Sequence, residues 1–391
     1  MEPSTAPTGR LWTAAFVRLT AMDLAYFLAA GLFVYALPLY AVGPVHAAAA
    51  GAGLAFGAYS LTALALRPWA GRLSDRFGRR RLMVSGAALA AVCALGFLVT
   101  STIAAVVAVR LLMGVAEAAF FVAGFAALAD VAPPGRAGEA LSYNSMALYG
   151  GLALGPPLGE RLIGWAGYAA AWWAAAALCA VAALFAQAFD DRAQDRTPAP
   201  GPARLIHRPS LKVALGLLGG LVASAGFLAF AAIRAVEIGS RAPSLVLLTY
   251  GAVVVAGRIA FARAADRGSP LRHLAGALAL TAAGAGLAAL TASVPTLLLA
   301  AAIIGIGVSV LTPAYFAAVF ATVGPRERGA AAGTASVFID LGIGGGPIVL
   351  GLLAQAQGLQ AAFAGGAIAA IAAAAWTAWL AAGRASAAHK G

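Results

Sequence analysis

Charged residues are scarce in this chain of 391 residues: Asp, Glu, Lys and Arg together make up 10% of it. Soluble proteins carry about 25%, so the chain lacks the charge to cover a water-facing surface. Hydrophobic residues make up 62%. Apolar runs of roughly 20 residues, each able to cross a hydrocarbon core of ~30 Å, recur along the whole chain. They do not alternate apolar and polar positions as barrel strands do. The sequence therefore predicts an all-α integral membrane protein.

Cysteine and histidine are rare too, with two Cys and four His in the chain. Cys93 and Cys179 both lie inside apolar runs, where they are expected to fill space and not to form a disulfide or hold a metal. The histidines fall in predicted loops or the tail, and no nucleophile, metal or phosphate-binding motif is found. We therefore expect no enzyme, no cofactor and no metal site.

The formal net charge of +12 comes from arginines and lysines in short loops between the apolar runs. A nucleic-acid module would gather them on one face, so no nucleic-acid partner is expected. Cytoplasmic loops of membrane proteins are enriched in Lys and Arg. Because the basic loops alternate with loops of low charge, and both termini are basic, the sequence predicts a multi-pass protein of the cell inner membrane. Both of its termini are predicted to be cytoplasmic.

Twelve apolar runs are long enough to be membrane spans. Residues 190–211, which have mixed charge and several prolines, separate the first six from the last six and are predicted to be a cytoplasmic linker. The expected domains are a six-helix bundle in residues 1–189 and a second in 212–391. The predicted spans are about 12–42, 50–70, 82–100, 103–128, 140–162, 165–189, 213–238, 244–261, 274–291, 295–323, 330–354 and 359–382.

The two halves repeat each other at a constant offset of 191 positions, the separation of Asp75 and Asp266. Such a repeat predicts two homologous bundles related by a pseudo-twofold axis along the membrane normal, with a site near mid-membrane between them. The same offset also superposes Gly114 on Gly305, Gly155-Pro156 on Gly346-Pro347, and Gly167 on Gly358.

The loop GRLSDRFGRRRLM, residues 71–83, joins the second and third spans. With the twelve spans and the repeat, it resembles the G-x-L-a-D-r-x-G-r-r/k signature of the major facilitator superfamily. The resemblance implies that fold, and a latch between the halves on the cytoplasmic side, with Asp75 at the positive start of the eleventh span near Gly329. The alternative is that the arginines only set topology. The matching residues are Gly71, Leu73, Asp75, Arg76, Gly78, Arg79 and Arg80.

Two more segments resemble elements of that family. Arg110 and Gly114 match its R-x-x-x-G element in span 4. In span 5, GLALGPPLGE is similar to the G-x-x-x-G-P-x-x-G-G signature of export antiporters, although Glu160 replaces the last glycine. This resemblance implies a drug or other export antiporter. The repeat of the segment in span 11, VFIDLGIGGGPIVLGLL, resembles the bacterial exporter branch that includes sugar-efflux-like and opine-metallophore exporters. The span 5 segment is expected to bend its helix and seal the interface between the halves, plain packing being the alternative. The matching residues are Gly151, Gly155, Pro156 and Gly159.

Charged residues inside spans are costly in hydrocarbon and therefore indicate a cavity or a partner. Burial disfavours the charged form of a carboxylate, whereas a nearby arginine favours it. We therefore predict Asp23, Glu117 and Asp340 as proton-coupling residues, with Arg110 as the tuning partner. A structural ion pair of Arg110 with Glu117, and structural roles for the other two acids, are the alternatives.

Arg110, Glu117 and Phe121 share one face of span 4, which the resemblance places on a central cavity lined by spans 1, 4, 7 and 10. No dense polar cluster suited to a sugar is present, so an amphipathic or cationic molecule is expected. A local Arg234–Glu237 pair is predicted, and Arg258 is expected to reach the membrane surface. The cavity candidates are Arg110, Phe121, Tyr26, Phe27, Tyr149, Phe230 and Tyr315.

The sequence thus predicts a monomeric secondary transporter that exports a small organic molecule in exchange for protons by alternating access. Its partners would be that molecule, protons and the lipid bilayer. The alternatives are a proton-coupled symporter that imports a small solute, and a membrane sensor or scaffold that does not transport.

Overall fold

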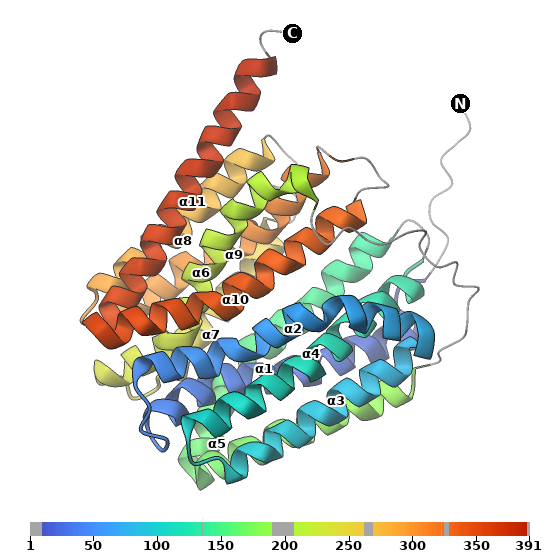
Figure 1. The fold of residues 1–391 in the computed structure, drawn as a ribbon, viewed down its shortest axis with the longest axis vertical. Helices are drawn as coiled ribbons and strands as arrows, with labels where there is room; N and C mark the ends of the chain where they lie inside the picture. Colours follow the sequence, from blue (N-terminus) through green and yellow to red (C-terminus); the bar gives the residue numbers. More distant parts are fainter. Residues whose placement is uncertain are drawn as a thin grey trace.

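The computed structural model describes residues 10–133, 136–189, 207–261, 269–321, 323 and 328–388, and helices make up nearly all of them. The predicted linker residues 190–206 and residues 262–268, which include Asp266, lie outside the described residues. In chain order the elements are α1 (Ala14–Val42), α2 (Ala49–Phe77), α3 (Arg79–Gly96), the short 3-10 helix η1 (Phe97–Val99), α4 (Ile103–Val131), α5 (Ala137–Gln187), α6 (Arg208–Glu237), α7 (Ser244–Ala260), α8 (Pro270–Leu290), α9 (Val294–Phe320), α10 (Arg328–Gln357) and α11 (Leu359–Ala388) (Figure 1).

Helix α5 contains two of the predicted spans. Its 51 residues would extend about 77 Å at 1.5 Å per residue, but the backbone leaves helical geometry at Ala166 and at Gly167, where φ is 74°. Glycine adopts positive φ without steric cost. Both ends of α5 lie near the start of α1, because Tyr143 contacts the Trp12 ring and Arg18 Nη1 donates to Ala188 O at 3.0 Å. The chain therefore reverses at Gly167, and the described helices supply the twelve predicted crossings.

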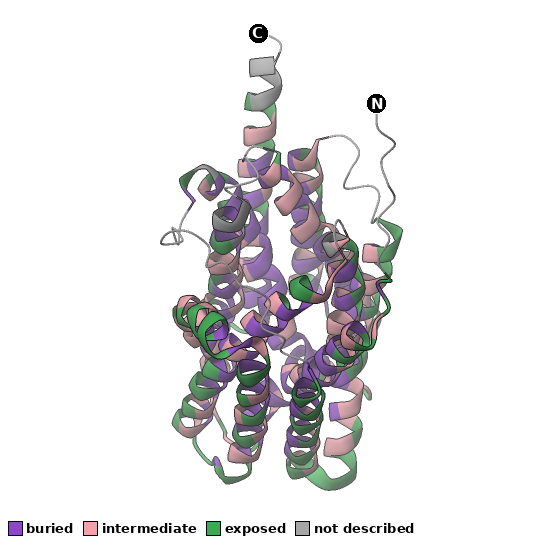
Figure 2. Cartoon of the chain, turned by 90° about the vertical axis from the view of Figure 1, so that its right-hand side faces the viewer, coloured by how far each residue is buried: buried purple, intermediate pink, exposed green. Residues whose placement is uncertain are grey.

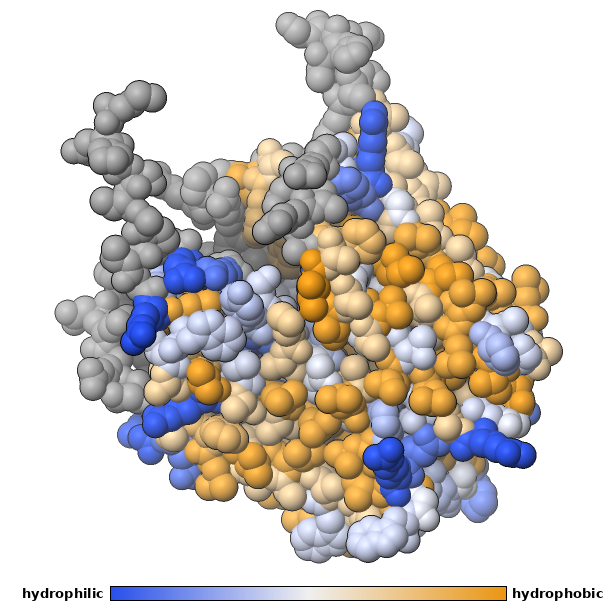
Figure 3. Space-filling view, turned by 180° about the vertical axis from the view of Figure 1, so that it is seen from behind, coloured by the Kyte–Doolittle hydropathy of each residue, from blue (hydrophilic) through white to orange (hydrophobic). Residues whose placement is uncertain are grey.

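The outer faces of the helices are apolar. Within the described residues, ten helices are long and apolar enough to cross a membrane, and α7 is a shorter apolar helix. Buried residues gather between the helices, whereas exposed ones face outward (Figure 2). Apolar residues cover most of the face in Figure 3, with hydrophilic residues towards its margins. The prediction of an all-α integral membrane fold is confirmed.

The helices pack as two bundles, α1–α5 in the lower part of Figure 1 and α6–α11 above them. The two most extensive contacts between the bundles are made by α2 with α10 and by α5 with α7, and we name them the α2–α10 seam and the α5–α7 seam; α6 also contacts α1 and α2. We call the end of the molecule where α5 ends and α6 begins the linker side, and the opposite end the far side. On the far side, an added Cβ at Gly57 would lie 2.1 Å from Gly344 O, and one at Gly251 would lie 2.5 Å from Ala153 Cβ. Small residues therefore bring both seams into backbone contact there.

The glycines of the span 5 signature contact their own bundle. A Cβ at Gly151 would lie 2.7 Å from Leu28 N, and one at Gly155 2.5 Å from Leu32 N, both in α1. The sequence predicts that they seal the interface between the halves. In the structure they instead let α5 pack closely on α1, because the face they occupy turns towards that helix.

Replacing Gly155 with alanine is expected to lower the melting temperature of the purified protein markedly, because the new methyl group would overlap the α1 backbone. Gly150 is the matched control, since a Cβ there would meet nothing within 4 Å, and alanine is the better helix former by about 1 kcal/mol. Thermal denaturation in detergent followed by size-exclusion chromatography compares the two variants. Equal melting temperatures for Gly155→Ala and Gly150→Ala would contradict the close packing.

Candidate functional site

An ion pair crosses the α2–α10 seam in the interior of the molecule. Arg67 Nε lies 2.5 Å from Asp340 Oδ2 and Nη2 lies 2.9 Å from Oδ1, and Ser60 Oγ is 3.5 Å from the same carboxylate. Asp340 is 3% exposed. Arg67 stands inside the predicted span of residues 50–70, four residues before Gly71 of the signature loop. A two-point arginine–carboxylate contact is among the strongest hydrogen-bonded pairs in proteins.

Glu117 lies close to this pair on α4. Tyr26 of α1 donates its hydroxyl to Glu117 Oε2 at 2.9 Å and stacks on Phe120 at 3.8 Å. The Arg67 guanidinium sits 4.9 Å from the centre of the Phe121 ring, and the charges of Arg67 and Glu117 interact. Two acids from different bundles and one arginine therefore form a cluster beside aromatic rings, in which Asp340 is buried and Arg67 and Glu117 are half-buried.

Arg110 is held by the backbone of α2. Its Nε donates to Ala55 O and its Nη2 to Phe56 O, both at 2.8 Å, and the guanidinium lies 4.1 Å from the centre of the Tyr59 ring. Neither of these two hydrogen bonds goes to Glu117, although the charges of Arg110 and Glu117 interact electrostatically. Arg110 therefore ties α4 to α2 beside the cluster.

Asp23 forms a separate contact within the N-terminal bundle. Asn144 Nδ2 of α5 donates to Asp23 Oδ2 at 2.5 Å, and both side chains are buried. The Asn144 oxygen has no hydrogen-bond partner among the described residues. Asn144 was not identified from the sequence, because an asparagine in an apolar run has no motif around it.

The predicted aromatic residues divide into two groups. Phe27 packs edge-on against Phe121 at 6.4 Å and so belongs to the cluster. Tyr149 accepts a hydrogen bond of 2.8 Å from Arg258 Nη2 across the α5–α7 seam. Phe230 and Tyr315 are fully buried in the C-terminal bundle, and the Tyr315 hydroxyl has no partner among the described residues. Of these residues, Phe27, with Tyr26 and Phe121, lies beside the Arg67, Asp340 and Glu117 cluster.

The signature loop is held on its own bundle. Arg79 Nη1 lies 2.5 Å from Asp75 Oδ1, and Arg79 also contacts Ser74 and Asp130. The Asp75 side chain is 68% exposed, and Gly78 joins α2 to α3 at φ 93°. Because the first side chains of α10 lie outside the described ones, a latch involving Asp75 stays a prediction. Of its other proposed members, Arg76 lies over Phe77 at 5.2 Å, a Cβ at Gly71 would meet nothing within 4 Å, and Arg80 is exposed.

The far end of the span 5 signature does reach the other bundle. Glu160, the residue that departs from the signature, accepts hydrogen bonds from the backbone and hydroxyl of Ser244 at the start of α7. A Cβ at Gly159 would meet Leu32 and Tyr35 of α1 at 3.4 Å, and Pro156 lies within α5. Glu160 therefore fastens the α5–α7 seam on the far side.

Two arginines change the interpretation of the sequence. Arg258, predicted to reach the membrane surface, lies two residues before the end of α7, with its guanidinium 4.2 Å from the centre of the Tyr149 ring. Arg67 was not identified as a candidate, although it lies inside span 2. The repeat held the missing signal, because the offset of 191 positions maps Arg67 onto Arg258. The predicted local pair of Arg234 with Glu237, at 3.1 Å, is confirmed.

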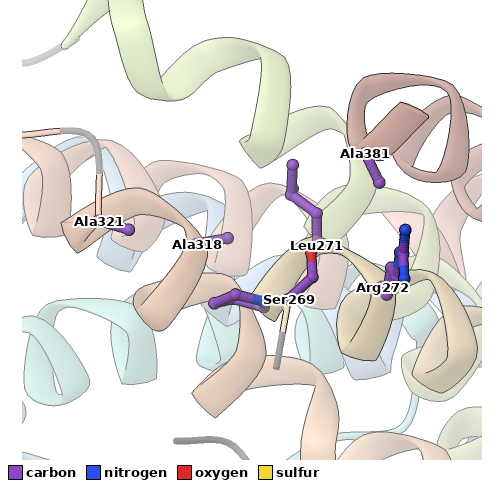
Figure 4. A pocket seen from close by; sticks show the side chains of 7 residues that line it. Ser269, Leu271, Arg272, Ala318, Ala321 and Ala381 are labelled. Carbon is purple, nitrogen blue, oxygen red and sulfur yellow. The ribbon is translucent and has the colours of Figure 1, made fainter. Parts of the chain in front are cut away.

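A surface hollow of about 330 Å³ lies elsewhere, on the C-terminal bundle. Leu271 and Arg272 at the start of α8 and Ala381 of α11 help to line it (Figure 4). None of the residues predicted for the site lines this hollow, so the cluster around Arg67 is the stronger candidate site.

Comparisons with known proteins agree with this architecture. The family model described as Major Facilitator Superfamily matches residues 19–239 and 218–390. An uncharacterized MFS-type transporter of Salmonella typhimurium is 29% identical over 361 residues, covering 88% of this chain and 91% of the relative. One from Burkholderia mallei is 30% identical over 380 residues, covering 91% and 89%.

Solved structures share the fold. The nucleoside transporter NupG superposes with a TM-score of 0.78 at 13% identity, covering 93% of this chain and 99% of that one. A bacterial homologue of the lysosomal transporter Spinster, inward-facing and occupied, gives 0.77 at 16% identity and 94% coverage of both chains. The human organic anion transporter MFSD10 gives 0.69 at 20% identity, covering 93% and 98%.

Proposed function

Because the chain belongs to the Major Facilitator Superfamily and is therefore a secondary transporter and not an enzyme, we propose that it exports a small organic molecule in exchange for protons. One observation supports this most directly: the Arg67–Asp340 pair joins the two bundles within predicted spans 2 and 11, and the charge of Glu117 in predicted span 4 interacts with it. Charges in that position are costly unless they serve a pathway. A scaffold without transport would have no use for them.

The conformation is consistent with alternating access. The close contacts of Gly57 with Gly344 and of Gly251 with Ala153 lie towards the far side of the two seams. One of the similar structures is an inward-facing form of the Spinster homologue. If the linker side is cytoplasmic, as the loop charges predict, this conformation is the inward-facing one.

The walls of the cluster favour an amphipathic cation as substrate. Glu117 offers a carboxylate beside the rings of Tyr26, Phe120 and Phe121, which together form an aromatic surface next to a negative charge. Such a surface attracts organic cations through both Coulomb and cation–π interactions. A proton on Glu117 and a cationic substrate would then compete for the same carboxylate, which is the requirement for exchange.

The first test uses everted membrane vesicles with an acidified interior. Tetraphenylphosphonium, an organic anion and a nucleoside form the panel, the last two chosen from the similar MFSD10 and NupG structures. We expect tetraphenylphosphonium to release trapped protons from wild-type vesicles, and Glu117→Gln to abolish the release because its amide cannot take up a proton. Asp23→Asn and Asp340→Asn in the same assay show whether another acid is the proton carrier.

The runner-up function is proton-coupled uptake, since the assignment of direction rests on the resemblance of residues 151–160 to an export signature. Uptake predicts no proton release in everted vesicles and accumulation of the substrate in right-side-out vesicles when the outside is acidified. That pair of results would replace export by symport.

A further inference from the structure

Two arginine contacts between the bundles occupy equivalent positions in the sequence repeat. The offset of 191 positions carries Arg67 to Arg258 and Tyr149 to Asp340. In the structure these four residues form one contact at each seam: Arg67 binds Asp340 between α2 and α10, and Arg258 binds Tyr149 between α7 and α5. The pseudo-twofold symmetry therefore places one arginine of each bundle against the facing helix of the other.

The two symmetry-related contacts differ in the charge of the arginine's partner. Arg67 contacts the carboxylate of Asp340, whereas Arg258 contacts a phenol. The offset also maps Glu117, the second acid near Arg67, onto Val308. Arg67 in the α2–α10 seam thus binds one acid of the other bundle and interacts with a second acid, on α4 of its own bundle. The equivalent arginine in the α5–α7 seam has neither acid at the equivalent positions.

The geometry allows Arg67 to change partner. Its guanidinium already lies over Phe121, which follows Glu117 by one helical turn on the same face of α4, so Glu117 is a neighbour on that face. Among the described residues, Glu117 accepts a hydrogen bond from Tyr26. A carboxylate accepts up to about four hydrogen bonds, so Glu117 has room for the guanidinium.

We propose that Arg67 is a shared cation, bonded to Asp340 of the other bundle in this conformation and transferred to Glu117 of its own bundle when the bundles separate along the α2–α10 seam. The inference rests on the proposed function. One proton from water binds the Asp340 carboxylate, and Arg67 keeps its own charge because a guanidinium does not lose its proton in proteins. A link between bundles thereby becomes a link within one bundle. The Arg258–Tyr149 contact involves no carboxylate, so protonation of an acid does not break it.

Few other charged groups surround Asp340. Besides Arg67 and Ser60 of α2, its charge interacts with Tyr59 of α2 and Glu117 of α4. The remaining helices that pack on α10 are α6, α9 and α11, and their charged residues stand towards the helix ends. In sequence these are Arg208, Lys212, Arg234 and Glu237 of α6 and Arg384 of α11, with none in α9.

Spin-label distance measurements on the full chain in nanodiscs test this proposal. The native cysteines are first changed to alanine. One label pair then spans the α2–α10 seam at the exposed positions Leu73→Cys and Gly333→Cys, and the other spans the α5–α7 seam at Ser142→Cys and Ile259→Cys. We expect acidification to shift the α2–α10 distance distribution, and Asp340→Asn to give the acidic distribution already in alkaline buffer.

The symmetry-related arginine provides the matched control. Arg258→Gln should leave the acid response of the α2–α10 pair intact, whereas Arg67→Gln should remove it. If Arg67→Gln does not fold, the neutral double variant Arg67→Gln/Asp340→Asn replaces it and should show one distribution in both buffers. An acid response that survives in either Arg67 variant, or that is lost equally in Arg258→Gln, would overturn the shared cation.

No substrate is needed for these distances, so the two proposals can fail separately. If the α2–α10 distance distribution does not change with pH while the protein still exchanges substrate for protons, the shared-cation proposal alone is overturned. If the α2–α10 distance distribution changes with pH but no compound of the vesicle panel releases protons, the proposed export alone is overturned.

Discussion

Replacing Arg67 with alanine is expected to abolish transport and to destabilise the protein more than removing both partners of its ion pair. The single variant leaves the Asp340 carboxylate buried without its cation, and breaking a buried pair in this way costs about 3–5 kcal/mol. Asp340 is 3% exposed, so water cannot replace the guanidinium. Melting temperature in detergent and substrate-driven proton release in vesicles measure the two effects.

The double variant Arg67→Ala/Asp340→Ala separates stability from function. With both charges gone, no buried charge is left unpaired, and we expect the melting temperature to return towards the wild-type value. Transport should stay lost, because the link between the bundles is gone. A double variant that transports normally would show that the pair is a packing feature only.

Replacing Arg110 with lysine is expected to reduce transport about a hundredfold. Arg110 ties α4 to α2 through two hydrogen bonds of 2.8 Å to Ala55 O and Phe56 O and through the Tyr59 ring. Hydrogen bonds to a charged group contribute about 1.5–3 kcal/mol each, and an ammonium cannot reproduce the planar fork. The loss of about 3 kcal/mol corresponds to a factor of about 100. Initial rates of proton release measure it.

Arg234 supplies the matched control for that prediction. It is also a buried arginine that donates to a backbone carbonyl, Thr291 O, at 2.6 Å, but it lies in the C-terminal bundle near the far end of α6. Arg234→Lys should lower stability with little effect on the transport rate per folded molecule. If both lysine variants transport equally, the position of Arg110 beside Glu117 has no special role.

Much of the architecture could be predicted from local properties of the sequence. Runs of apolar residues give membrane helices because an unpaired backbone group costs several kcal/mol in hydrocarbon. The reversal at Gly167 also has a local cause, a positive φ that glycine adopts freely. The three candidate acids are visible because a charge in an apolar run is conspicuous wherever the helix turns.

The partners of those acids could not be predicted in the same way. Asp340 and Arg67 are 273 residues apart in sequence, and Asp23 and Asn144 are 121 apart. The apolar runs surround each helix almost uniformly, so the sequence does not specify which face meets which neighbour. We expected Arg110 to tune Glu117, and the structure instead directs its hydrogen bonds to the α2 backbone.

By itself, the sequence determined that this protein is a helical membrane protein with twelve crossings and a repeat of 191 positions, because span length, composition and offset are properties of the chain alone. Only the tertiary structure decided that Arg67 meets Asp340 while its counterpart Arg258 meets Tyr149. Such contacts depend on how each helix is rotated and how far it is shifted along its axis. Close packing of the whole bundle sets that rotation and shift through glycine faces such as Gly57 on Gly344.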